Sequence, residues 1–362
     1  MTHTVGIIGL GFGRAHIPAF QANGCEVVAL CQRDQAAAKK VADTYGVPHV
    51  FERWETMLER AHPDIVVIAT PPRLHAEIAS RAFAGGAHVL CEKPLAMTRA
   101  EASEMVEAAA RARRVAMTGF NWRFPAAMGE LHRRVPALDR VFHLAGRWLG
   151  ARWADATATP TWRMDRAEAG HGAMGDQGVH LVDLVRWNFG EFARVSAQSG
   201  IAYPSRTVVG GGRGADAEDY CVVSAELASG AQLTLTVSRV AHGTNDQSLE
   251  VFGSGGSLSY RFTRTGARWF DGELQTAAPG GAWQPVPPPA REVAAGGDQI
   301  DMIGKATIAP LVAHMLECIR TGATPSPSFE DGMRAQAVLD AIAESAARRT
   351  WVEVARQPSR PG

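Results

Sequence analysis

Roughly the first 120 residues alternate short β-branched runs with longer stretches of helical spacing, and this pattern constrains the fold more than any other feature. The expected strands are Thr4–Leu10, Glu26–Cys31, His49–Phe51, Asp64–Ala69, Ala87–Cys91 and Val115–Phe120. The expected helices between them are Ala15–Asn23, Gln35–Tyr45, Trp54–Arg60, Leu74–Ala84 and Arg99–Arg113. Such alternation predicts βαβ units around a parallel sheet, and the continuously apolar run Ile65–Ile68 favours helices on both faces of that sheet.

The pattern changes after residue 122. A helix is expected at Ala126–Arg134, a strand at Val141–Leu149 and a helix at Gln177–Trp187. Between Phe192 and Phe270 several strands follow one another with short turns, which predicts a mainly antiparallel sheet. Examples are Tyr220–Leu227, Gln232–Val240 and Ser248–Phe252. The remaining expected elements are long loops at Tyr203–Ala215 and Pro279–Gly297, helices at Ile308–Arg320 and Glu330–Ala347, and an edge strand at Thr350–Val354.

These patterns predict an α/β domain followed by an α+β domain. Residues 1–122 should form a doubly wound Rossmann domain that binds a dinucleotide. Residues 123–362 should form the α+β domain, built around a mainly antiparallel sheet. We expect the helix at residues 330–347 to pack back toward the first domain.

Charge and cysteine content exclude several classes of protein. Lys plus Arg and Asp plus Glu both number 37, so the net charge is zero, which argues against nucleic acid or an anionic membrane as the main partner. No apolar run approaches the roughly 20 residues of a membrane span, and no basic segment precedes the first apolar stretch, so we expect a cytoplasmic protein. The five cysteines are scattered, which favours buried thiols over a disulfide framework or a metal site.

A glycine-rich turn, Gly9-Leu10-Gly11-Phe12-Gly13-Arg14, follows the first expected strand. Glycines at such a junction allow a tight turn and a close approach of the backbone to a pyrophosphate at the helix N-terminus. The spacing departs from G-x-G-x-x-G because Arg14 occupies the sixth position. The strand, turn and helix context nevertheless predicts nucleotide binding.

The end of the second expected strand carries Gln32 and Arg33 at about the offset, roughly 20 residues, where an acidic residue would bind the ribose 2′-hydroxyl of NAD. The missing carboxylate and the nearby guanidinium favour NADP, with NAD as the alternative. Arg33 could equally be a solvated residue at the start of the next helix.

Two further motifs could carry acid–base chemistry. Lys93, within Glu92-Lys93-Pro94, follows the fifth strand at the edge where doubly wound folds gather functional groups, although a lysine at a strand end is often only solvated. Asp176, His180 and Asp183 share one face of an expected helix. A histidine beside a carboxylate is a ready proton acceptor near neutral pH, but Asp176 could instead be a plain N-cap.

In this order and at similar spacings, these motifs resemble the glucose–fructose oxidoreductase, inositol dehydrogenase and rhizopine-catabolism family (Gfo/Idh/MocA). The resemblance also rests on Thr70-Pro71-Pro72-Arg73-Leu74-His75, Gly119-Phe120-Asn121-Trp122-Arg123 and Phe329-Glu330-Asp331-Gly332. It covers nearly the whole chain. The resemblance implies a Rossmann domain and, at residues 123–362, a substrate-binding and oligomerisation domain whose open sheet forms the contact in a homo-oligomer. It also implies oxidation or reduction of a secondary alcohol on a sugar or cyclitol.

The resemblance assigns catalytic roles to Lys93, Asp176 and His180. We expect His180 to take the alcohol proton, Lys93 to bind the same oxygen and Asp176 to orient His180 or a neighbouring hydroxyl, and the roles of Lys93 and His180 could be exchanged. The remaining candidates for cofactor contact are Gly9, Gly11, Phe12, Gly13, Gln32, Arg33, Thr70, Pro71, Pro72, His75, Glu92, Lys93, Asn121, Trp162 and Arg163. The candidates for the sugar site are Lys93, Asn121, Arg123, Trp153, Trp162, His171, Asp176 and His180.

Two other functions compete with this one. A hydrolase or eliminase could use transient oxidation to cleave a glycosidic bond, in which case the cofactor would recycle with no net change. A sensor without catalysis would predict degraded catalytic residues, yet Lys93, Asp176 and His180 are all present.

Overall fold

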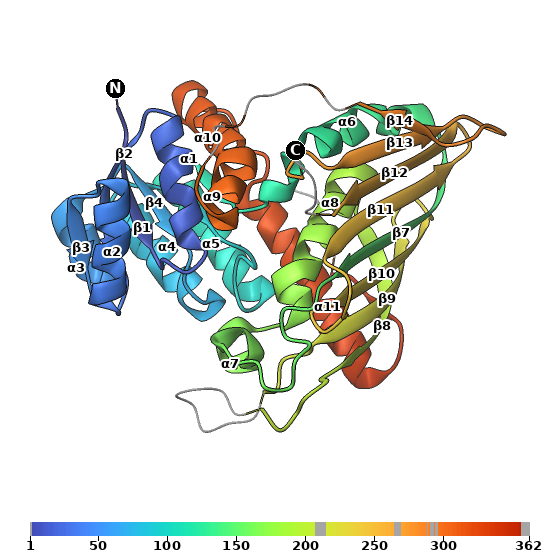
Figure 1. Ribbon diagram of the computed structural model, residues 1–362, viewed down its shortest axis with the longest axis horizontal. Coiled ribbons are helices and arrows are strands. Elements are labelled where there is room, and N and C mark those ends of the chain that lie inside the picture. The colour runs from blue at the N-terminus through green and yellow to red at the C-terminus, as the bar shows by residue number, and fades with distance from the viewer. Residues whose placement is uncertain are drawn as a thin grey trace. The chain divides into compact units, whose positions relative to one another are not determined.

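The computed structural model describes residues 2–206, 215–263, 269–287, 289, 293 and 296–355, and it divides into two compact units (Figure 1). The first comprises Met1–Ala126 and Ala290–Met333, and the second comprises Ala127–Pro289 and Arg334–Gly362. The sequence pattern predicted a single boundary, at residue 122. The return of residues 290–333 to the first unit has no signature in local periodicity, because it depends on contacts between distant segments.

The first unit contains a six-stranded parallel sheet in the order β3-β2-β1-β4-β5-β6. Its strands are β1 (Thr4–Ile8), β2 (Glu26–Cys31), β3 (His49–Phe51), β4 (Ile65–Ile68), β5 (His88–Cys91) and β6 (Ala116–Thr118). Its connecting helices are α1 (His16–Ala22), α2 (Gln35–Tyr45), α3 (Trp54–Ala61), α4 (His75–Ala84) and α5 (Arg99–Ala112). The strand order reverses between β1 and β4, and ligands bind doubly wound sheets at such a switch point.

Local chemistry accounts for these boundaries. The Asp34 side chain accepts a hydrogen bond from the Ala37 N–H and caps the N-terminus of α2. Gly46 ends the same helix in the left-handed region at φ +71°. All four residues of β4 are buried, as a strand covered by helices on both faces requires. The expected α/β fold is therefore confirmed, with strand and helix ends within a few residues of those predicted.

The returning segment adds α9 (Gln299–Ile303), a π-helical turn (Gly304–Ile308) and α10 (Ala309–Thr321) to the first unit. A Cβ on Gly304 would lie 2.2 Å from the carbonyl oxygen of Ala15, so this turn packs directly against the start of α1. The side chains of Phe329 and Met333, in the first turns of α11 (Phe329–Arg348), belong to the core of this unit. Burial in the first unit thus explains the amphipathic pattern that the sequence shows at Ile308–Arg320.

Within the described residues, Gln299–Thr321 has the length and apolar composition of a membrane-spanning helix. Half of its most apolar window is buried, and Ile308, Leu311 and Val312 have no exposed surface. Core helices of folded domains meet the same criteria of length and composition, so this stretch is weak evidence for a membrane segment.

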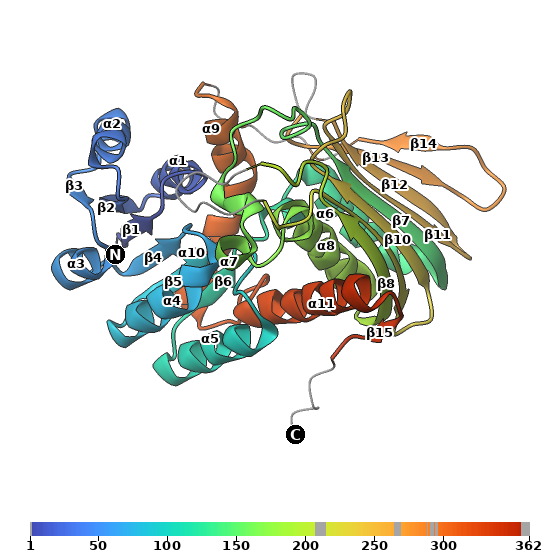
Figure 2. The same cartoon turned by 90° about the horizontal axis from the view of Figure 1, so that it is seen from below.

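The second unit is built on a nine-stranded sheet in the order β14-β13-β12-β11-β7-β10-β9-β8-β15. Its strands are β7 (Val141–Leu149), β8 (Phe192–Gly200), β9 (Tyr220–Leu227), β10 (Gln232–Ser238), β11 (Asp246–Gly253), β12 (Gly256–Phe262), β13 (Glu273–Ala277), β14 (Gln284–Val286) and β15 (Val352–Glu353). The helices are α6 (Ala126–Arg134), α7 (Arg166–Ala169), α8 (Val179–Phe189) and most of α11. Figure 2 shows α6, α8 and α11 gathered on one side of the sheet.

Three details of this unit differ from the expectations. β7 pairs with β10 in parallel, which was not expected; the other pairs are antiparallel, so the prediction of a mainly antiparallel sheet is confirmed. The expected helix at Gln177–Trp187 begins with a π-helical turn, Met174–Gly178, before α8. The expected loop at Pro279–Gly297 contains β14, and parts of it, like residues 207–214 of the loop at Tyr203–Ala215, lie outside the described residues.

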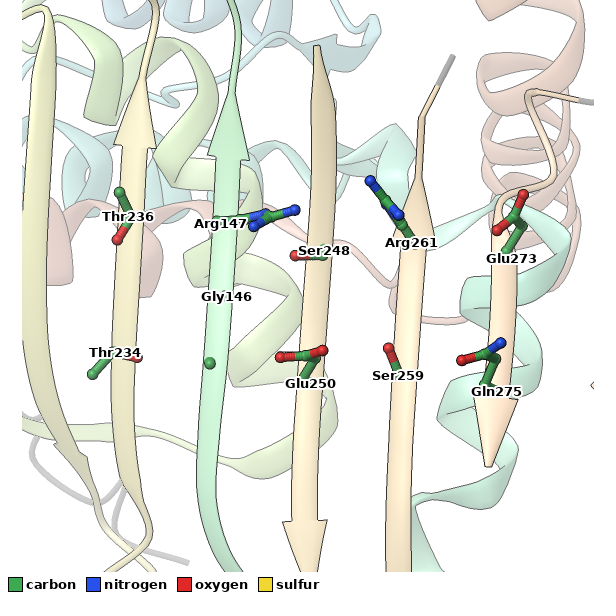
Figure 3. A pocket seen from close by; sticks show the side chains of 11 residues that line it. Gly146, Arg147, Thr234, Thr236, Ser248, Glu250, Ser259, Arg261, Glu273 and Gln275 are labelled. Atoms are coloured by element: carbon green, nitrogen blue, oxygen red, sulfur yellow. The ribbon is translucent and has the colours of Figure 1, made fainter. Parts of the chain in front are cut away.

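The face of the sheet away from these helices is open and polar. Along β10, Leu233 and Leu235 are buried while Thr234 and Thr236 point outward, the alternation of a half-covered sheet. The centre of this face is hollowed to about 460 Å³ between Arg147, Glu250 and Arg261 (Figure 3). None of the predicted site residues lines this hollow.

All five cysteines are buried and free. Burial raises the pKa of the Cys31 thiol to about 12, with a smaller contribution from Glu55. The interpretation of the cysteines as small core residues is confirmed. The part of the chain that the structure describes contains no cluster of three or more His, Cys, Asp or Glu side chains with the geometry of a metal site.

Candidate functional site

The glycine-rich turn joins β1 to the first helical turn of the first unit at the switch point of the sheet. Gly9 has φ +89°, and a Cβ there would lie 2.6 Å from the carbonyl oxygen of Ala69. The Gly9 N–H donates to the carbonyl of Cys31 at 2.9 Å. A Cβ on Gly13 would lie 2.9 Å from the Cβ of Ala69. Both glycines are therefore required by the packing of the chain itself.

Gly11 differs from these two glycines. Its φ lies outside the left-handed region, and no atom of the described chain comes within 4 Å of a Cβ built there. Neither backbone conformation nor packing requires a glycine at this position, so the space beside it is open to a ligand. A dinucleotide pyrophosphate needs this kind of close backbone approach, and the turn fits that group.

Thr70 lies just after β4, next to the turn. Its Oγ1 is buried and has no hydrogen-bond partner among the described residues. Pro71 and Pro72 follow, and Pro72 begins a 3-10 turn that leads into α4. A buried hydroxyl without a partner is costly unless a ligand or water satisfies it. The Thr70 hydroxyl therefore also fits a cofactor passing this strand end.

Gln32 directly follows β2, the strand next to the glycine-rich turn. Its side-chain Oε1 accepts a hydrogen bond from the Leu10 N–H at 3.0 Å. Because a backbone N–H can only donate, this contact fixes which way the amide points. The NH₂ group of Gln32 is therefore directed away from Leu10, where it can donate hydrogen bonds. Arg33 is exposed beside it.

Glu92 pairs with a residue that no sequence motif singled out. His16 Nε2 and Glu92 Oε1 lie 2.8 Å apart, and both side chains are buried. Burial alone raises the pKa of the Glu92 carboxyl, but the hydrogen bond and charge interaction with His16, together with the charge of Lys93, bring it below its usual value. The Lys93 N–H also donates to Glu92 Oε2 at 3.4 Å. A carboxylate is thus held beneath the half-buried Lys93.

His75 is fully buried between two strand ends. Its Nε2 lies 2.9 Å from the carbonyl oxygen of Thr70, and its Nδ1 lies 3.0 Å from the carbonyl oxygen of Pro94. Burial lowers the pKa of His75, more than its hydrogen bonds to these carbonyls raise it. His75 thereby ties the segment after β4 to the segment that carries Lys93.

Two other predicted residues of the first unit are held by the returning segment. The Asn121 side-chain amide donates to Thr307 Oγ1 at 2.7 Å. Arg123 donates to Ser326 Oγ at 2.9 Å and lies 3.6 Å from an Asp331 carboxylate oxygen. Both side chains are buried, and these contacts favour structural roles.

In the second unit, Asp176 lies in the π-helical turn and His180 in the first turn of α8. The N-cap of the π-helical turn is Ala173, so Asp176 is not the plain N-cap that the sequence allowed, and its side chain is 21% exposed. His180 is buried against Trp148 of β7, with ring centroids 5.6 Å apart. Asp183, one turn further on, is almost fully buried. Of the two acids on this face, Asp176 is therefore the one that a ligand can reach.

The side chain of Arg163 contacts that of Asp176. Its Nε lies 3.4 Å from Asp176 Oδ1, and its guanidinium stacks 4.3 Å from the ring centroid of Trp162. The pair Trp162-Arg163 and the helix that carries Asp176 and His180 therefore meet within the second unit. Gln177 Oε1 and Thr161 Oγ1, which flank these residues in the chain, are buried and have no partner among the described residues.

The other two predicted residues of this unit are occupied by protein contacts. Trp153 is buried, with the guanidinium of Arg152 4.8 Å and that of Arg239 5.1 Å from its ring centroid. His171 Nε2 lies 3.1 Å from the side-chain nitrogen of Gln336 in α11. Stacking of Trp153 on a sugar and contact of His171 with one stay predictions.

Several residues that form contacts around the candidate site residues were not predicted from the sequence. His16 had a signal, since it lies only two positions after the glycine-rich turn. Glu218, Asp219 and Arg239 had none beyond two adjacent acids before a strand, because their partners lie far away in the chain.

Two family profiles match the chain. Residues 3–120 match one described as an oxidoreductase family with an NAD-binding Rossmann fold. Residues 136–259 match one described as a GFO/IDH/MocA C-terminal domain.

Two relatives are similar over nearly their full lengths. Levoglucosan dehydrogenase of Pseudarthrobacter phenanthrenivorans is 31% identical over 97% of both chains. Inositol 2-dehydrogenase of Rhizobium meliloti is 27% identical over 98% of this chain and 100% of its own. A solved structure of levoglucosan dehydrogenase in complex with NADH and levoglucosan has a TM-score of 0.87 and 29% identity, covering 98% of this chain and 100% of that one.

Proposed function

The chain belongs to the Gfo/Idh/MocA family of NAD-binding oxidoreductases, and from this premise we propose that it transfers a hydride between a nicotinamide cofactor and a secondary alcohol or ketone of a sugar or cyclitol. The observation that carries the proposal is the open space beside Gly11 at the switch point of the sheet. The relatives named for levoglucosan and inositol support the substrate class.

The first unit supplies the cofactor site. The pyrophosphate would lie on the turn of Gly9, Gly11, Phe12 and Gly13, and the nicotinamide half would pass Thr70, Pro71 and Pro72. The bound nicotinamide supplies hydride acceptance and donation. The protein binds and orients it through these backbone and hydroxyl groups.

The adenosine end would meet Gln32 and Arg33, and we propose that it accepts NADP in preference to NAD. With its oxygen held by Leu10, Gln32 presents an NH₂ donor, which suits a phosphate oxygen. Neither residue can repel a 2′-phosphate, and Arg33 adds a positive charge nearby. The opposing consideration is that the levoglucosan dehydrogenase structure holds NADH.

Three side chains would handle the proton of the alcohol. His180 accepts the hydroxyl proton as the hydride leaves carbon, and Lys93 donates a hydrogen bond to the same oxygen and stabilises its developing charge. The sequence leaves these two roles exchangeable. Asp176, beside Arg163, would orient His180 or a neighbouring sugar hydroxyl. Glu92 and His75 would fix the backbone from which Lys93 projects.

A substrate screen tests this proposal. Common monosaccharides, anhydrosugars and inositols are incubated with NAD⁺ or NADP⁺, and the absorbance of the reduced nicotinamide is followed. One reduced cofactor per oxidised sugar is expected. Cleavage of glycosides with no net reduction would instead favour the hydrolase or eliminase. Failure of the whole panel, with no cofactor binding, would contradict the proposal.

The proposal also extends to the assembly and the location of the protein. We propose a cytoplasmic homo-oligomer that associates through the open face of the nine-stranded sheet. His143 of β7, Phe252 of β11 and Trp283, just before β14, form an aromatic group there, with Trp283 39% exposed. Sedimentation of the wild type and of Trp283→Glu checks this, since a monomeric wild type would rule it out.

A further inference from the structure

We propose that a buried ion pair, Arg239 with Asp219, together with the adjacent Glu218, positions Arg163 against Asp176. The inference rests on the proposed function, because it assigns Arg163 and Asp176 a place beside the substrate. Arg239, Asp219 and Glu218 touch neither substrate nor cofactor in this account. They are positioning residues that act through Arg163 and Asp176.

The ion pair is deeply buried. Arg239 is 1% exposed and Asp219 is 2% exposed. Arg239 Nε donates to Asp219 Oδ1 at 2.8 Å, and the Arg239 N–H donates to the Asp219 carbonyl at 3.0 Å. The second carboxylate oxygen of Asp219 accepts from the Ala202 N–H at 2.9 Å. Buried charges are retained only where every donor and acceptor is satisfied, so this pair has a fixed geometry.

The rest of the Arg239 guanidinium reaches the segment that carries Arg163. Its Nη1 donates to the carbonyl oxygen of Arg163 at 2.9 Å, and its Nη2 donates to the carbonyl oxygen of Ala217 at 3.3 Å. The Met164 carbonyl accepts from the Ala217 N–H at 3.2 Å. The backbone at residues 163–164 is therefore fixed to the segment that bears Asp219.

Glu218 fixes the backbone of the turn that carries Asp176, the partner of Arg163. Its Oε1 accepts from the N–H groups of Gly172 at 2.8 Å and Met174 at 3.1 Å, and its carbonyl accepts from the Ala173 N–H at 2.8 Å. A Cβ on Gly172 would lie 2.0 Å from the Glu218 carbonyl oxygen, so no other residue fits this approach. The Asp176 N–H donates to the Gly172 carbonyl at 2.9 Å, which carries the constraint to the π-helical turn.

Two acids that are adjacent in the chain thus position the two partners of the contact between Arg163 and Asp176. Asp219 acts through Arg239 on Arg163, and Glu218 acts directly on the turn that carries Asp176. The resulting separation of 3.4 Å between Arg163 Nε and Asp176 Oδ1 is set by a shared backbone segment. A shift of about 1 Å at a catalytic group can reduce the rate as much as 100-fold. Fixing the backbone around Arg163 and Asp176 should therefore have a large effect on kcat.

The first test is Arg239→Lys, which keeps the charge beside Asp219 and loses the fork that reaches the Arg163 carbonyl. We expect kcat with the best sugar to fall about 10- to 100-fold, while KM for the cofactor stays within about 2-fold. The matched control is Arg348→Lys, which alters an exposed pair with Glu344 in α11 and should leave both constants unchanged.

A double-variant cycle separates positioning from general stability. In the Arg163→Ala background, Arg239→Lys should cause no further loss of kcat, because the group it positions is gone. Multiplicative losses in the double variant would overturn the inference. If Arg239→Lys does not fold, Glu218→Gln is combined with Asp176→Ala in the same kind of cycle. No further loss of kcat in that double variant would support the inference, and multiplicative losses would overturn it.

A crystal structure of Arg239→Lys gives a readout that does not need activity. Separation of Arg163 from Asp176 beyond 4 Å would support the inference, and retention of the wild-type contact would overturn it. Failure of the wild type on every sugar would count against the proposed function alone, since this structural readout would still decide the inference.

Discussion

Substitution of Gly11 by alanine separates what the fold needs from what the cofactor needs. A Cβ at this position meets no atom of the described chain within 4 Å, and the backbone is outside the left-handed region. Alanine should therefore leave the free energy of unfolding unchanged or raise it by about 0.4–1 kcal/mol, because the unfolded chain loses conformational freedom. The same methyl group would occupy the space in which the pyrophosphate approaches the backbone.

The expected result is a variant that is stable and binds cofactor poorly. Loss of that close approach should weaken NAD(P)H binding at least tenfold, equivalent to about 1.4 kcal/mol or more. Calorimetric titration with the reduced cofactor gives the dissociation constant, and urea unfolding gives the stability.

Two glycines supply the controls. Gly129, in α6, also has no neighbour within 4 Å of a built Cβ, and Gly129→Ala should stabilise the protein without changing cofactor affinity. Gly9→Ala should instead destabilise folding by about 1–2 kcal/mol, because Gly9 is left-handed and abuts the Ala69 carbonyl. Wild-type cofactor affinity in Gly11→Ala would refute the assignment of this turn.

Three other substitutions test separate parts of the account. Lys93→Met should retain cofactor binding and reduce kcat by about 100-fold or more, and unchanged turnover would remove Lys93 from the mechanism. Gln32→Asp should shift the ratio of kcat/KM for NADP over NAD toward NAD by repelling the 2′-phosphate, and a constant ratio would show that this residue does not select the cofactor. His88 Nδ1 accepts the Val115 N–H at 2.9 Å, and burial, with smaller contributions from Arg114 and His3, lowers its pKa to about 4. Because the folded pKa lies below the unfolded value of about 6.5, its contribution to stability is complete above pH 6.5 and is lost as the pH falls toward 4. After a discount for partial exposure, we expect the free energy of unfolding to fall by about 1 kcal/mol over this pH range. Urea unfolding at several pH values should show this decrease in the wild type but not in His88→Asn.

The sequence predicted the elements whose pattern is local. β2, α2, α6, β7 and β9 begin and end at the predicted residues, since apolar periodicity and capping residues such as Asp34 act over a few positions. The parallel pairing of β7 with β10 and the π-helical turn before α8 were missed. Both involve contacts between segments that are distant in the chain, β7 with β10 and the start of the π-helical turn with Glu218, which residue spacing does not indicate.

The candidate site divides in the same way. The glycine-rich turn, Gln32 and the Asp176–His180 spacing are local motifs, and their positions in the elements could be predicted. The pairs His16–Glu92 and Arg239–Asp219 join residues far apart in the chain, so no local pattern indicates them. Likewise, no local pattern indicates the contacts of Arg123 with Ser326 and Asp331, and the role of Arg123 as a sugar ligand stays a prediction.

The central claim is that the Lys93 ammonium and the His180 imidazole act on one hydroxyl beside the bound nicotinamide. The most direct test is a crystal structure of the protein with reduced cofactor and the sugar that the screen identifies. The account predicts both nitrogen atoms within about 3.2 Å of the same substrate oxygen. A complex in which either nitrogen is directed away from that oxygen, with no bridging water, would contradict it.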